Sequence, residues 1–293
     1  MPSVFEPSSV REGADLLARA AAEGLGVSVE RPGGDVVVST RRLNRVLEHE
    51  TGDLTCRVET GIRLSVLNRR LARHGQMLAL DPPGDPSIGA CIAEDLSGPR
   101  RHRYGAVRDL LLGVTVVLGD GTIASSGGKV VKNVAGYDLG KLFCGSEGRL
   151  GLIARASFRL TPLPTETRTL VVGVRAPEVA LAKMQAILRS QLVPSAVDLL
   201  WPGRLCVLFE GSARAVEAQL AAARALVGGV EGDPWADVMA FQAGARGRRS
   251  FRGLDGPMLV RAAEAFVDED VARDWSPLAE RVRATFDPAG VLV

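Results

Sequence analysis

The feature that most restricts the fold of this chain is a run of three glycines, Gly145, Gly148 and Gly151. The run follows a helical pattern over residues 137–143 and leads into the alternating apolar segment Leu152–Leu160, which predicts a strand. A Rossmann dinucleotide-binding fingerprint needs the opposite order, with a strand before the glycines and a helix after them. The order found in this chain therefore excludes a Rossmann domain.

Further glycines stand between Ile88 and Ile153, and Gly127-Gly128-Lys129-Val130 is the densest group after the triplet. That group lacks the spacing and the hydroxyl residue of a Walker A phosphate loop. Glycine permits positive φ and lets a ligand approach the backbone, so the region suits the phosphates and ring edges of a buried cofactor. A set of ordinary tight turns fits the same glycines, and these residues alone leave both interpretations open.

A break at Thr161-Pro162-Leu163-Pro164 predicts a boundary between two domains, residues 1–164 and residues 165–293. Beyond the break the pattern predicts strand, helix, two strands and a helix, an order typical of a ferredoxin-like α+β domain. These elements are expected at Thr169–Val174, 177–190, 196–200, 205–210 and 212–227, and a final helix at 276–286.

The first domain shows a mixture of helical and strand patterns. Ser8 or Ser9 can cap a helix that runs to Ala22, and Gly119-Asp120-Gly121 predicts a hairpin turn. Strands are expected at 27–29, 36–38, 54–58, 114–118 and 122–123, and a helix between Gly61 and Gly75.

Composition narrows the class of function. The chain has 293 residues, a net charge of +2 and 4% aromatic residues, so neither a basic field nor stacking platforms favour nucleic acid. No segment has the length of apolar sequence that a transmembrane helix needs, and the first residues lack a signal-peptide pattern. The expected location is the cytoplasm. The four cysteines contain no CxxC pair, so neither an iron–sulfur cluster nor a structural zinc is expected within this chain.

Catalytic residues are not evident. None of the three histidines, His49, His74 and His102, has a neighbour at metal-ligand spacing, so no metal site is predicted. His102 is the one candidate base, and its flanking arginines favour its neutral form. Glu94 and Asp95 are expected on a loop surface.

Two groups of arginines each allow two interpretations. Arg100, Arg101 and Arg103 can anchor a carboxylate or cofactor phosphates, or they can be solvated. The second group can face an acidic partner or form a flexible charged loop, and the loop is favoured. Its members are Arg246, Arg248, Arg249 and Arg252.

The string Gly128–Leu142, continuing through Gly145–Gly151, resembles the vanillyl-alcohol-oxidase/PCMH flavoprotein family, and within it the FAD-binding E subunits of bacterial glycolate oxidases. Five shorter stretches carry the same resemblance, so it covers nearly the whole chain. They are 39–46, 80–84, 96–101, 105–113 and 286–290.

The resemblance implies a PCMH-type FAD-binding domain of two α+β subdomains, followed by a smaller ferredoxin-like α+β domain. It also implies an oxidoreductase subunit that supports flavin-mediated oxidation of glycolate, together with a catalytic flavin subunit and an iron–sulfur subunit. By position, two groups of residues are expected to contact FAD from opposite sides. The first group is Pro82, Gly89, Ala90, Ala93, Ser97, Gly98, Tyr104 and Gly105, and the second is Glu147, Gly148, Gly151 and Ile153.

One departure from the family pattern concerns the cofactor directly. Relatives hold the FAD diphosphate in a glycine-rich loop between their first two strands, whereas here only Glu30–Asp35 connects residues 27–29 to 36–38. The shortening, and the negative charge of Asp35, argue against tight FAD binding. This shortening motivates one alternative, a flavin-free scaffold subunit of the same kind of complex. A separate alternative is a self-sufficient FAD oxidase acting on an unrelated alcohol, which would need a base that the sequence does not show.

Overall fold

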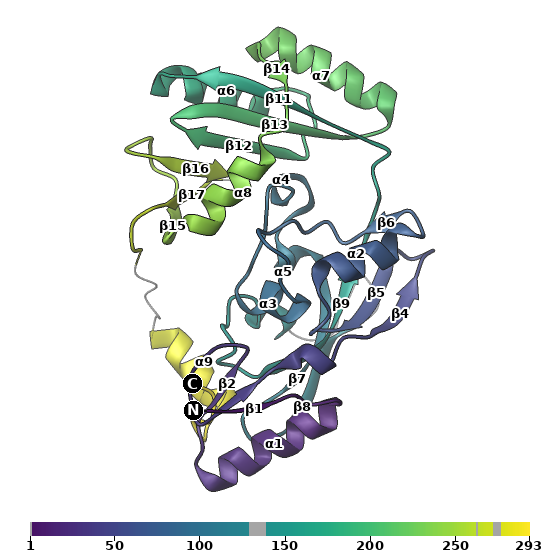
Figure 1. Cartoon of the computed structure of the whole chain (residues 1–293), viewed down its shortest axis with the longest axis vertical. Coiled ribbons are helices and arrows are strands. Elements are labelled where there is room, and N and C mark those ends of the chain that lie inside the picture. The colour runs from purple at the N-terminus through teal and green to yellow at the C-terminus, as the bar shows by residue number, and fades with distance from the viewer. Residues whose placement is uncertain (1, 129–138, 262, 272–276) are drawn as a thin grey trace.

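The computed structural model describes residues 2–128, 139–261, 263–271 and 277–293, and it consists of two α+β parts stacked along the long axis (Figure 1). The first part contains a parallel sheet in the order β1-β3-β2 and an antiparallel sheet in the order β4-β5-β9-β7-β8. Its elements are β1 (Ser3–Phe5), α1 (Val10–Glu23), β2 (Val27–Val29), β3 (Val36–Val38), η1 (Thr40–Arg42), β4 (Val46–Glu50), β5 (Thr55–Glu59), α2 (Leu64–Ala72), β6 (Gln76–Met77), α3 (Ile88–Ala93), α4 (Arg101–Tyr104), α5 (Val107–Leu110), β7 (Leu111–Val117), β8 (Ile123–Gly127), η2 (Leu139–Leu142), β9 (Leu152–Arg159) and β10 (Thr161–Pro162).

The second part is built on one seven-stranded antiparallel sheet in the order β14-β11-β13-β12-β16-β17-β15. The first four strands of that order follow the chain as fourth, first, third and second, which is the ferredoxin-like arrangement that the sequence predicted. Its elements are β11 (Glu166–Val174), α6 (Pro177–Arg189), β12 (Ala196–Trp201), β13 (Gly203–Gly211), α7 (Ala213–Val227), β14 (Val230–Glu231), α8 (Trp235–Gly244), β15 (Gly247–Ser250), β16 (Met258–Arg261) and β17 (Glu264–Val267).

Alternation along β13 explains how this sheet is covered on both faces. Leu205 and Val207 pack beneath α6 and α7, whereas Cys206 points to the other face and packs against Val238 of α8. Successive side chains of a strand point to opposite faces, so one strand supplies both cores. The α8 face is the one turned towards the first part of the molecule (Figure 1).

The C-terminal segment returns to the first part. Helix α9 (Pro277–Phe286) packs Val282 and Phe286 against the first core, and the Phe286 ring meets the edge of Phe143 at 5.7 Å. Leu292 then forms a parallel bridge with Val27, which brings the two ends of the chain together (Figure 1). This differs from the expectation that residues 165–293 form one domain, because α9 buries its apolar side chains on the first part.

The region expected to be a flexible Arg/Gly-rich loop contains the end of α8 and all of β15. Its arginines are held by acids of the same chain: Arg246 by Asp268 at 2.9 Å and Arg249 by Asp255 at 2.8 Å. The expectation of a flexible loop at 243–253 is therefore wrong. The partners lie between 6 and 22 residues further along the chain, so sequence spacing gave no sign of them.

Candidate functional site

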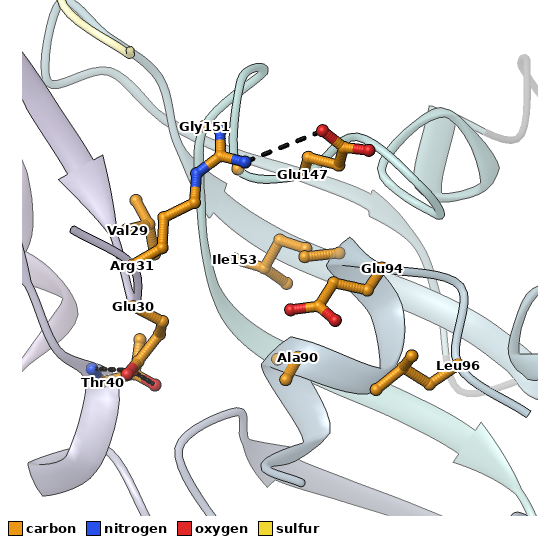
Figure 2. A pocket seen from close by; sticks show the side chains of 13 residues that line it. Val29, Glu30, Arg31, Thr40, Ala90, Glu94, Leu96, Glu147, Gly151 and Ile153 are labelled. Carbon is orange, nitrogen blue, oxygen red and sulfur yellow. Dashed lines mark hydrogen bonds and ion pairs between the residues drawn. The ribbon is translucent and has the colours of Figure 1, made fainter. Parts of the chain in front are cut away.

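A cavity of about 250 Å³ opens between the end of β2, helix α3 and the glycine loop before β9 (Figure 2). We call it the flavin-side cavity, because seven of the residues expected to contact FAD line it. These seven are Gly89, Ala90, Ala93, Glu147, Gly148, Gly151 and Ile153, and the other lining residues are Val29, Glu30, Arg31, Thr40, Glu94 and Leu96.

Helix α3 presents a small-residue surface to this cavity. Ser87 caps the helix by accepting a hydrogen bond from the Ala90 backbone N–H at 3.2 Å. Ile88 and Ile92 are fully buried in the core, which leaves Gly89, Ala90 and Ala93 towards the cavity. A Cβ at Gly89 would lie 3.3 Å from the Thr60 backbone oxygen, so the helix packs closely against Thr60 there and a larger residue would require a small shift.

The opposite wall is apolar at its base and charged at its rim. Ile153 projects from β9 and is only 4% exposed, and Val29 and Leu96 complete an apolar surface with Ala90. A flat, aromatic ring system would bury apolar area on such a surface. The geometry of the base therefore fits a flavin ring.

Three carboxylates and one guanidinium line the rim of the flavin-side cavity. Glu30 has a left-handed φ of 59°, and its carboxylate accepts hydrogen bonds from the Thr40 backbone N–H and, at 2.6 Å, from the Thr40 hydroxyl. Arg31 reaches across to Glu147 at 3.7 Å, while Glu94 points into the space between them (Figure 2). The rim thus carries an excess of negative charge.

The connection from β2 to β3 is folded on itself rather than around a ligand. The Ser28 hydroxyl donates to the backbone oxygens of Arg31 and Gly33 at 2.8 and 2.7 Å. A side chain at Gly34 would lie 2.4 Å from the Gly26 backbone oxygen, so the two strand ends are in direct contact. A diphosphate needs converging N–H groups or cations. The apolar base of the cavity therefore fits a flavin ring, whereas the β2–β3 connection does not fit the diphosphate of FAD.

A second cavity, of about 570 Å³, lies between the two parts of the molecule and shares Glu94 and Leu96 with the first. The predicted residue Ser97 lines it from the first part, and Gln242 and Arg248 line it from the second. Arg248 faces Asp95 and Glu264, each at 3.9 Å. The positive charge of Arg248 is therefore largely compensated.

Four of the predicted FAD-contacting residues, Pro82, Gly98, Tyr104 and Gly105, line neither cavity. Gly98 packs so closely on Asp81 that a side chain would lie 1.7 Å from its backbone oxygen. The Tyr104 hydroxyl donates to Glu210 at 3.4 Å in the other part of the molecule. Tyr104 therefore serves the contact between the two parts, and the role of all four positions in FAD binding stays a prediction.

The arginines expected either in solvent or on phosphates instead join the two parts. Arg100 donates to the buried Glu210 carboxylate at 3.0 and 2.6 Å, and Arg101 donates to Glu264 at 2.8 Å. Arg103 donates to the Glu210 backbone oxygen at 3.0 Å. We call this group of side chains the junction.

His102 lies in α4, between Arg101 and Arg103 of the junction, and lines neither cavity. Burial lowers its pKa, and the nearby Asp198 carboxylate opposes that shift. The predicted preference for the neutral form has the right direction, but its main cause is burial rather than the neighbouring arginines. A catalytic base at this place would be remote from the flavin-side cavity.

The sequence missed the acids of the rim. Glu30 and Glu94 were expected in a turn and on a loop surface, yet both line the flavin-side cavity. The resemblance at residues 39–46 contains Thr40, the hydrogen-bond partner of Glu30, so only that motif gave a signal. Residues 129–138 of the motif that carried the resemblance lie outside the described residues.

Within residues 2–128, 139–261, 263–271 and 277–293, no cluster of three or more His, Cys, Asp or Glu side chains is arranged to hold a metal ion. In the same residues, no helix combines the length and the apolar composition needed to span a bilayer.

Residues 4–127 match the family model described as an FAD binding domain. This range runs from β1 to β8, and it contains the β2–β3 connection and α3, two walls of the flavin-side cavity.

Curated relatives include subunits of a glycolate oxidase. The chain is 31% identical to glycolate oxidase subunit GlcE of Escherichia coli over 84% of this chain and 71% of that protein. It is 34% identical to subunit GlcD of Bacillus subtilis over 60% of this chain, but spans only 38% of GlcD. A mitochondrial D-lactate dehydrogenase of Saccharomyces cerevisiae is also 34% identical, with 27% of its length covered.

Among solved structures, alkyldihydroxyacetonephosphate synthase has the same fold. The superposition covers 98% of this chain and 75% of that one, with a TM-score of 0.75 and 17% identity. This likeness shows the fold alone, and together with the match to the FAD binding domain it confirms the expected α+β fold class.

Proposed function

Because this chain belongs to the family of FAD-linked oxidoreductase subunits that includes GlcE of Escherichia coli, we propose that it is the E-type subunit of a cytoplasmic glycolate oxidase-type complex. Its proposed partners are a catalytic flavin subunit and an iron–sulfur subunit. The similarity to GlcE, which extends over both parts of the molecule, is the observation that carries this proposal.

The charges of the flavin-side cavity favour a role that supports catalysis by a partner. Oxidation of a 2-hydroxy acid requires a base for the hydroxyl proton and a cation to hold the carboxylate. Arg31 is engaged with Glu147, while Glu30 and Glu94 would repel an anionic substrate. We therefore assign glycolate oxidation to the partner flavin subunit rather than to this cavity.

A flavin-free scaffold is the second candidate, and the closed β2–β3 connection favours it specifically. In that role the chain would position the catalytic and iron–sulfur subunits without carrying a cofactor. An absorbance spectrum of the purified chain, recorded before and after addition of excess flavin, separates the two candidates. A flavin band that stays with the protein after gel filtration supports the cofactor-binding role.

The decisive experiment for the complex is affinity purification of the tagged chain from its own host. We expect a flavoprotein and an iron–sulfur protein to co-purify, with glycolate-dependent dye reduction in the complex and none in the isolated chain. Recovery of the chain alone under gentle conditions, or glycolate turnover by the isolated chain, would contradict the proposal.

A further inference from the structure

We infer that the flavin-side cavity binds an uncharged flavin in preference to FAD, and that Glu30 is the residue that sets this preference. The inference deepens the proposed function, on which it rests, by naming the ligand class of the cavity. Three independent features of the described residues carry it: the size of the cavity, the sign of its charges, and the position of the Glu30 carboxylate.

The size of the cavity matches part of FAD rather than all of it. Pockets for drug-sized ligands have volumes of roughly 300–1,000 Å³, whereas this cavity has about 250 Å³. Its apolar base, formed by Val29, Ala90 and Ile153, is the portion that suits a ring system. The ribityl diphosphate and adenosine would have to leave through the rim.

The rim has the wrong charge for a diphosphate. Glu30, Glu94 and Glu147 line the opening, and Arg31, the one cation among the described lining residues, is already paired with Glu147 (Figure 2). Arg149, which does not line the cavity, also lies 3.8 Å from Glu147, so the described charges still sum to an excess of carboxylates. Passage towards the second cavity runs beside Glu94, which lines both cavities. Each carboxylate repels a phosphate group, and the repulsion is stronger near a protein surface than in bulk water.

Glu30 occupies the hydrogen-bond donors that an anionic ligand would need. Its carboxylate takes both the backbone N–H and the hydroxyl of Thr40, a buried residue that lines the cavity. The residue adopts a left-handed backbone conformation, with φ of 59°, which a non-glycine residue adopts only at an energetic cost. The carboxylate is therefore an internal anion held at the place where a ligand phosphate would be neutralised.

The test is a titration of the purified full-length chain with riboflavin, FMN and FAD, followed by quenching of flavin fluorescence. We expect riboflavin to bind at least tenfold more tightly than FAD, with FMN also weaker than riboflavin. Added salt should improve FAD binding and leave riboflavin unchanged, because salt screens the repulsion of exposed charges.

Glu30→Gln tests the residue itself, because glutamine keeps the acceptor for Thr40 and removes the charge. We expect FAD to bind about tenfold more tightly, with riboflavin unaffected. Glu23→Gln, at the exposed end of α1, is the matched control and should change neither affinity. An unchanged riboflavin affinity also shows that the variant is folded.

Several outcomes would overturn the inference. They are FAD binding as tightly as riboflavin to the unmodified chain, failure of any flavin to bind, or an FAD affinity that Glu30→Gln does not change. These results are independent of the proposed function, since co-purification of the partner subunits is measured without added flavin. A chain that assembles but binds no flavin would leave the scaffold role in place and refute only the cavity assignment.

Discussion

The junction and the rim of the flavin-side cavity use the same kinds of charged side chains in opposite ways. At the junction, the fully buried Glu210 carboxylate receives two hydrogen bonds from Arg100. Within the sheet of the second part, the buried Asp198 is likewise paired with Arg261 at 2.5 Å. At the rim, Glu147 has Arg31 at 3.7 Å and Arg149 at 3.8 Å, whereas no ion pair joins Glu30 or Glu94 to an arginine among the described residues. The buried carboxylates Glu210 and Asp198 each have an arginine partner, whereas the carboxylates at the rim outnumber the arginines near them.

The paired charges at the junction stabilise the fold, whereas the charges at the rim of the cavity select the ligand. A buried charge without a partner is strongly destabilising, so the junction must be neutralised for the two parts to stay in contact. A charge at an open rim is solvated and costs little, so it can be retained for its effect on what enters. Substitutions should therefore have large effects on stability at the junction and small ones at the rim.

The largest expected effect is that of Arg261→Ala, which would leave the Asp198 carboxylate buried without its guanidinium. Loss of one partner of a buried pair costs about 3–5 kcal/mol, and the urea unfolding midpoint should fall accordingly. The paired control is Asp198→Leu with Arg261→Met, which removes both charges and should recover much of the loss. A single variant as stable as the unmodified chain would contradict the assignment of this pair to structure.

Arg100→Ala should have the next largest effect, because Glu210 is fully buried while Arg100 is partly exposed. We expect a loss of about 2–3 kcal/mol, towards the lower end for truncation of a buried hydrogen-bonded charge pair. Arg246→Ala is the matched control, since its partner Asp268 is 77% exposed and such pairs contribute about 0–1 kcal/mol. Equal midpoints for the two variants would remove the distinction between buried and exposed pairs.

The sequence predicted the parts of this architecture that depend on local patterns. The hairpin around Gly119-Asp120-Gly121 and the ferredoxin-like element order follow from turn residues and periodicity, and both are present. The resemblance also gave the seven predicted residues that surround the flavin-side cavity.

The contacts that were missed join residues far apart in the chain. Arg100 and Glu210 are 110 residues apart, and α9 packs on a core formed mainly by residues before 161. Neither contact leaves a periodic signal in the sequence. An arginine that pairs with a buried acid looks the same as a solvated one, and the apolar face of α9 does not say which core it packs against. The role of Glu30 was missed for a different reason: its left-handed backbone and its bond to Thr40 exist only once β2 and η1 are adjacent.

The buried Asp81 makes the stability of the fold depend on pH. Burial raises the pKa of its carboxyl group to about 7; the nearby Asp198 carboxylate adds to this shift, whereas Arg100 and Arg261 oppose it. The folded chain therefore holds a proton on Asp81 in a pH range where the unfolded chain, with a pKa near about 4, has lost it. This contribution to stability is fully present below about pH 4, the unfolded pKa, and declines as pH rises until it is lost above the folded pKa of about 7.

Asp81→Asn should remove that pH dependence. We expect the stability of the unmodified chain, relative to the variant, to fall by about 1–2 kcal/mol between pH 5 and pH 7. Urea unfolding at both pH values measures the difference. A variant with the same pH profile as the unmodified chain would show that Asp81 titrates normally and that the junction is more hydrated than its contacts indicate.

The smallest expected effect on stability is that of Arg31→Ala at the rim. Its ion pair with Glu147 is long, and the Arg31 side chain is 37% exposed, so the unfolding free energy should change by only about 0–1 kcal/mol. The same substitution removes the one cation among the described lining residues of the cavity, so FAD should bind several-fold more weakly while riboflavin is unaffected. A loss of stability as large as that of Arg100→Ala would place Arg31 with the structural charges. A change confined to FAD affinity would instead show that the rim charges act on the ligand and leave the fold to the junction.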